Sequence, residues 1–169
     1  MMRQPILGAV LAGGRTSRFG SDKAAAMWGG RSLAEHAAGL IERHVDRVVL
    51  IGPGELPDLP RSGLGPLGGI AGALDDAAAH GWGSVLTIGC DMPSVPADLL
   101  HALLRRAPAY CSDAPVLGHW PAALGAHLLA WLEGDDRSVA RWARTIGALP
   151  VASPAPLANI NTPEDLLAL

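Results

Sequence analysis

The sequence has few cysteines, almost no lysine and no long hydrophobic run. Its two cysteines, Cys90 and Cys111, cannot build a disulfide framework and have no metal-site spacing. No run approaches 18 apolar residues, and the N-terminus lacks signal-peptide features, so we expect a cytoplasmic protein with no membrane partner. A formal net charge of -3 provides no general positive field for nucleic acid, so no nucleic-acid partner is expected either.

The apolar content of the chain is ample for a folded core. Of its 169 residues, 49% are hydrophobic and 17% are charged, which excludes the composition of disordered chains. This length fits one domain, which we expect to span residues 1–169. Because Phe and Tyr occur once each, the core must be built mainly from aliphatic residues, as in α/β proteins.

The order of apolar segments predicts an α/β fold with a mostly parallel sheet. Continuous runs of Val, Ile and Leu predict buried strands, and segments with helical periodicity lie between them. Ser32 and Glu35 form a capping-box pattern at the start of the first of these helices. The predicted strands are 6–11, 47–51, 85–90 and 149–152, and the predicted helices are 31–44, 68–80, 96–106, 138–146 and one beginning after Thr162.

Two other regions are less regular. Residues 107–121 contain several prolines, which predict loops and short strands, and residues 53–63 predict a loop. An open parallel sheet of this kind binds its ligands at the carboxyl ends of its strands. The functional residues should therefore lie directly after the strands.

The stretch LAGGRTSRFGSDK, residues 11–23, follows the first predicted strand. Gly13 and Gly14 expose backbone amides to a ligand, and Arg15, Arg18 and Lys23 add positive charge, a combination typical of phosphate binding. Lys23 is the one lysine among 13 basic residues, which favours a specific role for a compact ammonium group. The alternative is a tight turn with solvated basic side chains.

Asp91 follows the predicted strand 85–90, where a carboxylate can hold Mg²⁺ together with substrate phosphates. The alternative is a cap for the next turn. Residues 63–68, GLGPLG, mimic the dinucleotide fingerprint, but no strand precedes them and Pro66 falls where the helix should begin. The six histidines stand singly and indicate no catalytic arrangement.

Four segments, LAGGRTSRFGSDK, GPLGGIAGAL, CDMP and NINTPEDL, together resemble the MobA family of molybdenum cofactor guanylyltransferases, in the family's order. The resemblance implies a three-layer α/β/α, Rossmann-like nucleotidyltransferase fold. It also implies transfer of GMP from GTP to the phosphate of molybdopterin, with release of pyrophosphate.

The resemblance also implies a set of site residues. Nucleotide contacts would come from the strand end, from the loop before the second helix and from Lys23, with Arg18 beside the phosphates. Mg²⁺ would be held by Asp91 and Asn161, with Asn159 a weaker candidate. The implied catalytic residues are Lys23, Arg18 and Asp91, and the implied nucleotide-binding residues are Leu11, Ala12, Gly13, Gly14, Lys23, Gly65 and Asp91.

The chain departs from the family pattern in two places, and base selectivity stays open. Gly52-Pro53-Gly54 lacks an asparagine often found there, and the stretch before Gly65 lacks an aspartate frequent in the family, for which Asp58 is a candidate substitute. On the acceptor side, only residues 118–121, GHWP, resemble the family's His-Pro loop. The alternatives are a related transferase using CTP or another acceptor, and a non-catalytic nucleotide-binding protein. Proteins that deliver or accept the cofactor are possible partners.

Overall fold

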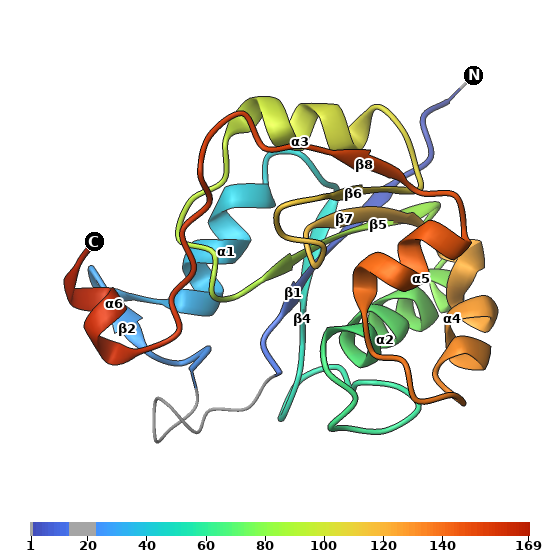
Figure 1. Cartoon of the computed structure of the whole chain (residues 1–169), viewed down its shortest axis with the longest axis horizontal. Helices are drawn as coiled ribbons and strands as arrows, with labels where there is room; N and C mark the ends of the chain where they lie inside the picture. The colour runs from blue at the N-terminus through green and yellow to red at the C-terminus, as the bar shows by residue number, and fades with distance from the viewer. Residues whose placement is uncertain (1, 14–22) are drawn as a thin grey trace.

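A computed structural model describes residues 2–13 and 23–169. The described chain contains a six-stranded sheet in the order β4-β1-β5-β7-β6-β8 (Figure 1). Only β7 runs antiparallel to its neighbours in this sheet, so the predicted mostly parallel arrangement is confirmed. The strands are β1 (Ile6–Leu11), β4 (Arg47–Ile51), β5 (Ser84–Gly89), β6 (Ala109–Cys111), β7 (Gly118–Pro121) and β8 (Leu149–Val151), and a separate hairpin joins β2 (Met27–Trp28) to β3 (Arg31–Ser32).

Helices cover both faces of the sheet, which confirms the three-layer α/β/α fold (Figure 1). One core cluster packs α1 and α3 against the sheet, and the other packs α2, α4 and α5 against the opposite face. The helices are α1 (Leu33–Ile41), α2 (Pro66–Ala79), α3 (Ala97–Leu104), α4 (Gly125–Trp131), α5 (Val139–Thr145) and α6 (Pro163–Leu167), with a 3₁₀ turn η1 (Ala122–Leu124) before α4.

Local sequence signals explain where most of these helices begin. Ser32 caps α1 and forms the predicted capping box with Glu35, and Thr162 caps α6 in the same way. Pro66 was expected to conflict with the start of a helix, but it is the first residue of α2. Proline is favoured at this position because a backbone N–H there would have no partner within the helix. Residues 63–68 still lack the strand that should directly precede a dinucleotide fingerprint, because the strand before α2 ends at Ile51.

The described residues contain no helix that is both long and apolar enough to cross a membrane.

His119 lies in the interior of the sheet, which corrects its expected place in an acceptor loop. It stands opposite Leu86, in the middle of β5, and is 5% exposed. Its Nδ1 donates to the carbonyl groups of Leu103 and Arg106, at 3.1 and 3.2 Å, which leaves Nε2 to accept from the Ser84 hydroxyl at 2.8 Å. The imidazole therefore ties β5 and β7 to the end of α3.

This buried imidazole predicts a loss of stability in acid. Burial lowers the pKa of His119 in the folded protein, so the unfolded chain takes up a proton first as the pH falls below about 6.5. We expect the free energy of unfolding to fall by up to about 1.4 kcal/mol per pH unit through His119 alone. Urea titrations of the wild type and His119→Gln at several pH values measure the free energy of unfolding of each protein. If this free energy fell equally steeply with pH in both, the contribution assigned to His119 would be contradicted.

Candidate functional site

The ends of three parallel strands lie side by side at one edge of the sheet. In the register of the sheet, Leu11 at the end of β1 faces both Ile51 of β4 and Gly89 of β5. The next residues continue the pattern, since the Ala12 N–H donates to the Ile51 carbonyl at 2.8 Å and the Cys90 N–H donates to the Leu11 carbonyl at 3.3 Å. The segments that follow β1, β4 and β5 are thereby brought together.

Three of the predicted site residues meet at this edge. The Lys23 ammonium lies 3.5 Å from the Asn161 side-chain oxygen and 3.9 Å from Asp91 Oδ2. The side chains of Lys23 and Asp91 are only 18% and 31% exposed, so the pair is partly shielded from water. Residues 138 positions apart in the sequence therefore share one small site.

A second pair of contacts holds the segment that carries Asn161. The Ile160 N–H donates to the carbonyl of Asp91 at 2.8 Å. The carboxylate of Asp165 accepts from the N–H groups of Asn161 and Thr162, at 2.8 and 2.9 Å, and these bonds lower the pKa of Asp165. Asp165 was not among the predicted site residues, although its place three residues after Thr162 is the signal of a capping box.

The donor set at this site suits a hard cation. Among the described residues, no three His, Cys, Asp or Glu side chains are grouped so that they could hold a metal ion by themselves. The side-chain oxygens of Asp91 and Asn161 nevertheless face the same ammonium group. One or two protein oxygens, completed by water and phosphate, are the usual protein contribution to a Mg²⁺ site, so these two residues fit that ion.

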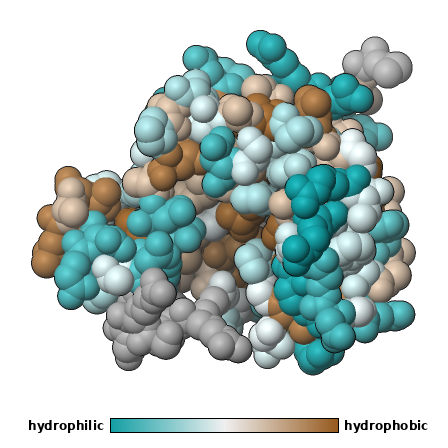
Figure 2. Space-filling view, in the orientation of Figure 1, coloured by the Kyte–Doolittle hydropathy of each residue, from teal (hydrophilic) through white to brown (hydrophobic). Residues whose placement is uncertain are grey.

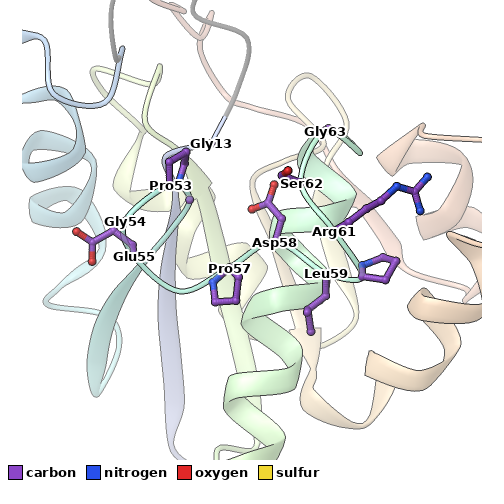
Figure 3. Close-up of a pocket in the computed structure, with 13 residues that line it drawn as sticks. Gly13, Pro53, Gly54, Glu55, Pro57, Asp58, Leu59, Arg61, Ser62 and Gly63 are labelled. Atoms are coloured by element: carbon purple, nitrogen blue, oxygen red, sulfur yellow. The ribbon is translucent and has the colours of Figure 1, made fainter.

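Beside the strand ends lies a cavity of about 850 Å³ (Figure 3). Gly13 borders it at the end of β1, and Gly65 borders it at the start of α2. Most of its wall comes from the segment between β4 and α2, which was predicted as a loop. The space-filling view shows the surface hollowed between the part that carries α6 and the rest of the molecule (Figure 2).

Asp58 is the acidic side chain directed into this cavity (Figure 3). Its carboxylate oxygens lie 3.5 and 3.6 Å from the position that a Cβ on Gly13 would occupy. Burial raises the pKa of Asp58 above its ordinary value. Two other charged residues of the wall, Glu55 and Arg61, point away from Asp58 in the same view (Figure 3).

The other predicted site residues differ in their burial. Leu11 is buried at 6% exposure and Ala12 is partly buried, so both present mainly backbone to the edge of the sheet. Asn159, the weaker metal candidate, is exposed. Gly14 and Arg18 lie outside the described residues.

Comparison with known proteins gives one consistent family. Residues 8–149 match the family described as the MobA-like NTP transferase domain. A protein from Rhizobium leguminosarum bv. trifolii named molybdenum cofactor guanylyltransferase is 37% identical over 190 residues, covering 97% of this chain and 91% of the relative. A Rhodobacter capsulatus protein of the same name is 34% identical over 177 residues, covering 95% and 93%.

A solved structure supports the same fold. The molybdopterin-guanine dinucleotide biosynthesis protein A of Archaeoglobus fulgidus superposes with a TM-score of 0.74. The match covers 96% of this chain and 95% of that one, at 21% sequence identity.

The loops that follow β1 and β4 approach so closely that we expect only glycine to be tolerated at position 52. Its φ is +151°, and an added Cβ would lie 2.8 Å from the backbone nitrogen of Gly13. We expect Gly52→Ala to lower the free energy of unfolding by about 1–3 kcal/mol and to weaken nucleotide binding, because the two loops must separate. Thermal unfolding and GTP titration measure both effects.

Gly81→Ala, in the turn after α2, is the matched control for this experiment. Gly81 also has a positive φ, +77°, but an added Cβ there would meet no atom within 4 Å, and the residue does not line the cavity. It should cost roughly 1 kcal/mol of backbone strain and leave GTP affinity unchanged. Equal GTP affinities for the two variants would contradict the role given to Gly52.

Proposed function

The chain belongs to the MobA-like NTP transferase family, and we propose that it transfers GMP from GTP to the terminal phosphate of molybdopterin. The products are molybdopterin guanine dinucleotide and pyrophosphate. The observation that carries the proposal is the meeting of Lys23, Asp91 and Asn161 beside the cavity-bearing edge of the sheet. The names of the relatives, each matched over more than 90% of its length, support the choice of substrates.

The reaction is an in-line displacement at the α-phosphorus of GTP. An oxygen of the molybdopterin phosphate forms a new P–O bond to that phosphorus, and the bond to the bridging oxygen of pyrophosphate breaks. Because the nucleophile is already an anion, no side chain has to remove a proton. Catalysis then depends on aligning two anions and neutralising their charge.

Each residue at the strand ends has a role in this scheme. Lys23 stabilises negative charge on the triphosphate, and Arg18, outside the described residues, is proposed to assist it. Asp91 and Asn161 are proposed to hold Mg²⁺, which supplies further charge neutralisation when bound. The backbone of Leu11, Ala12, Gly13 and Gly14, and that of Gly65, are proposed to contact the nucleotide.

Asp58 favours guanine as the base. Guanine presents two adjacent donors, N1–H and the exocyclic amine, which one carboxylate can accept together. Cytosine, uracil and adenine place acceptors next to their donors and would turn an acceptor toward the Asp58 carboxylate. The direction of Asp58 into the cavity, close to Gly13, therefore supports GTP over CTP.

Incubation with molybdopterin, Mg²⁺ and each NTP in turn tests the proposal. We expect pyrophosphate and a pterin dinucleotide from GTP. Release from CTP alone would indicate a cytidylyltransferase, and tight GTP binding without turnover would indicate a non-catalytic protein. Either outcome would contradict guanylyl transfer. Partner proteins that deliver or accept the cofactor stay a prediction.

Asp91→Asn should separate metal dependence from nucleotide binding. Loss of the charged oxygen should reduce kcat by roughly 100-fold or more and raise the Mg²⁺ concentration needed for half-maximal rate. Steady-state kinetics across a Mg²⁺ series measure both. Asp98→Asn, in the first turn of α3, is the control. Normal Mg²⁺ dependence in Asp91→Asn would remove this residue from the metal site.

Lys23→Ala should lower kcat more than it raises the KM for GTP, because charge builds up on the phosphates in the transition state. Lys23→Arg restores the charge but not the compact ammonium, so we expect only partial recovery. A change confined to KM would show that Lys23 binds the ground state and transition state equally.

Asp58→Ala should reduce the preference for GTP over ITP, which lacks the exocyclic amine, by roughly 10- to 100-fold. The measurement is kcat/KM for both nucleotides. Glu55→Gln is the control, since Glu55 lines the same cavity but points away from Asp58. A preference that survives Asp58→Ala would place guanine recognition elsewhere.

A further inference from the structure

The segment before α6 is held by three consecutive backbone N–H groups. Ile160 donates to the carbonyl of Asp91, while Asn161 and Thr162 both donate to Oδ2 of Asp165. Ile160 is 1% exposed, so its side chain anchors the segment in the protein. Asn161 therefore projects from a backbone that is fixed on both sides.

We propose that Asp165 is a positioning residue, which holds the Asn161 side chain in place to bind the divalent cation with Asp91. This inference rests on the proposed Mg²⁺ site. Asp165 contacts the site through the backbone of Asn161 and through Thr162, whose hydroxyl in turn accepts from the Asp165 N–H at 3.2 Å, and its carboxylate also interacts electrostatically with Lys23. The Lys23 contact with Asn161 shows that the positioned side chain is directed toward the same point as Asp91.

Comparison with α1 shows that this carboxylate does more than cap a helix. The capping box of α1 has Glu35 at the equivalent position, and Glu35 accepts from the N-cap residue Ser32 at 2.6 Å. Asp165 accepts from its N-cap residue Thr162 and also from the residue before it, Asn161. The additional bond goes to the residue proposed as a metal ligand.

The stability of the fold depends little on this helix. α6 is five residues long and contributes no buried residue, whereas α1 contributes Leu33, Ala34, Ala37 and Ile41 to the core. Breaking the Asp165 contacts should therefore loosen the end of the chain without unfolding the sheet. The loosening should act on the cation site, since residues that orient metal ligands commonly change metal affinity about 10- to 100-fold.

The test compares Asp165→Ala with Glu35→Ala, which removes the same kind of carboxylate from the other capping box. Mn²⁺ is the probe, and its affinity is measured by electron paramagnetic resonance in the absence of GTP and pterin. We expect Asp165→Ala to weaken Mn²⁺ binding about tenfold with little change in Tm. Glu35→Ala should lower Tm and leave Mn²⁺ affinity unchanged.

Two further measurements complete the test. Asp165→Glu should restore the cap of α6 but only part of the Mn²⁺ affinity, because Glu35 shows that glutamate reaches the N-cap amide, whereas the bond that positions Asn161 goes to the residue before the N-cap. Hydrogen exchange should accelerate at Asn161 and Thr162 in Asp165→Ala, whether or not metal binds. Unchanged exchange at these amides, or unchanged Mn²⁺ affinity beside measurable wild-type binding, would overturn the positioning role.

The proposed function can fail separately from this inference. A wild type that binds Mn²⁺ at Asp91 and Asn161 but releases no pyrophosphate from GTP would refute guanylyl transfer and leave the role of Asp165 intact. If the wild type transfers GMP but Asp165→Ala leaves the Mn²⁺ affinity unchanged, the positioning role of Asp165 is refuted and guanylyl transfer is supported. Failure of the wild type to bind Mn²⁺ would overturn the metal-positioning inference.

Discussion

The parallel register of β4, β1 and β5 is the constraint on which the site depends. Because Leu11 stands level with Ile51 and Gly89, the loops after three strands emerge at one edge. All six residues of β1 are buried, so a shift of one residue would move every side chain to the opposite face of the sheet and disrupt the packing on both sides. The cavity at Gly13 and the contact of Lys23 with Asp91 both follow from that alignment.

The site combines residues from both halves of the chain. The N-terminal segment supplies Lys23, β5 leads into Asp91, and the chain then returns to place Asn161 beside them. Its return is secured by polar backbone contacts, with Ile160 bound to the carbonyl of Asp91 and the next two amides bound to Asp165. The proposed phosphate-binding and cation-binding groups are thus connected by a few directional hydrogen bonds at the end of the sheet.

Much of the fold could be predicted because its signals are local. Continuous apolar runs predicted β1, β4 and β5, and the capping boxes at Ser32 and Thr162 marked two helix starts. The hairpin β2–β3 and helix α4 gave no clear periodic signal. The burial of His119 depends on strand pairing with β5, which the sequence of GHWP does not reveal. In the site, Lys23, Asp91 and Asn161 were predicted as candidates, but the second bond of Asp165 is a property of the folded backbone.

The central claim is that groups from three distant segments form one nucleotide and cation site. A crystal structure with GTP and Mn²⁺, using the anomalous signal of the metal, tests it most directly. We expect the metal within bonding distance of Asp91 and Asn161, the phosphates beside Lys23, and the guanine edge against Asp58. A metal bound away from both Asp91 and Asn161, or a guanine outside the cavity bordered by Gly13 and Asp58, would contradict the account.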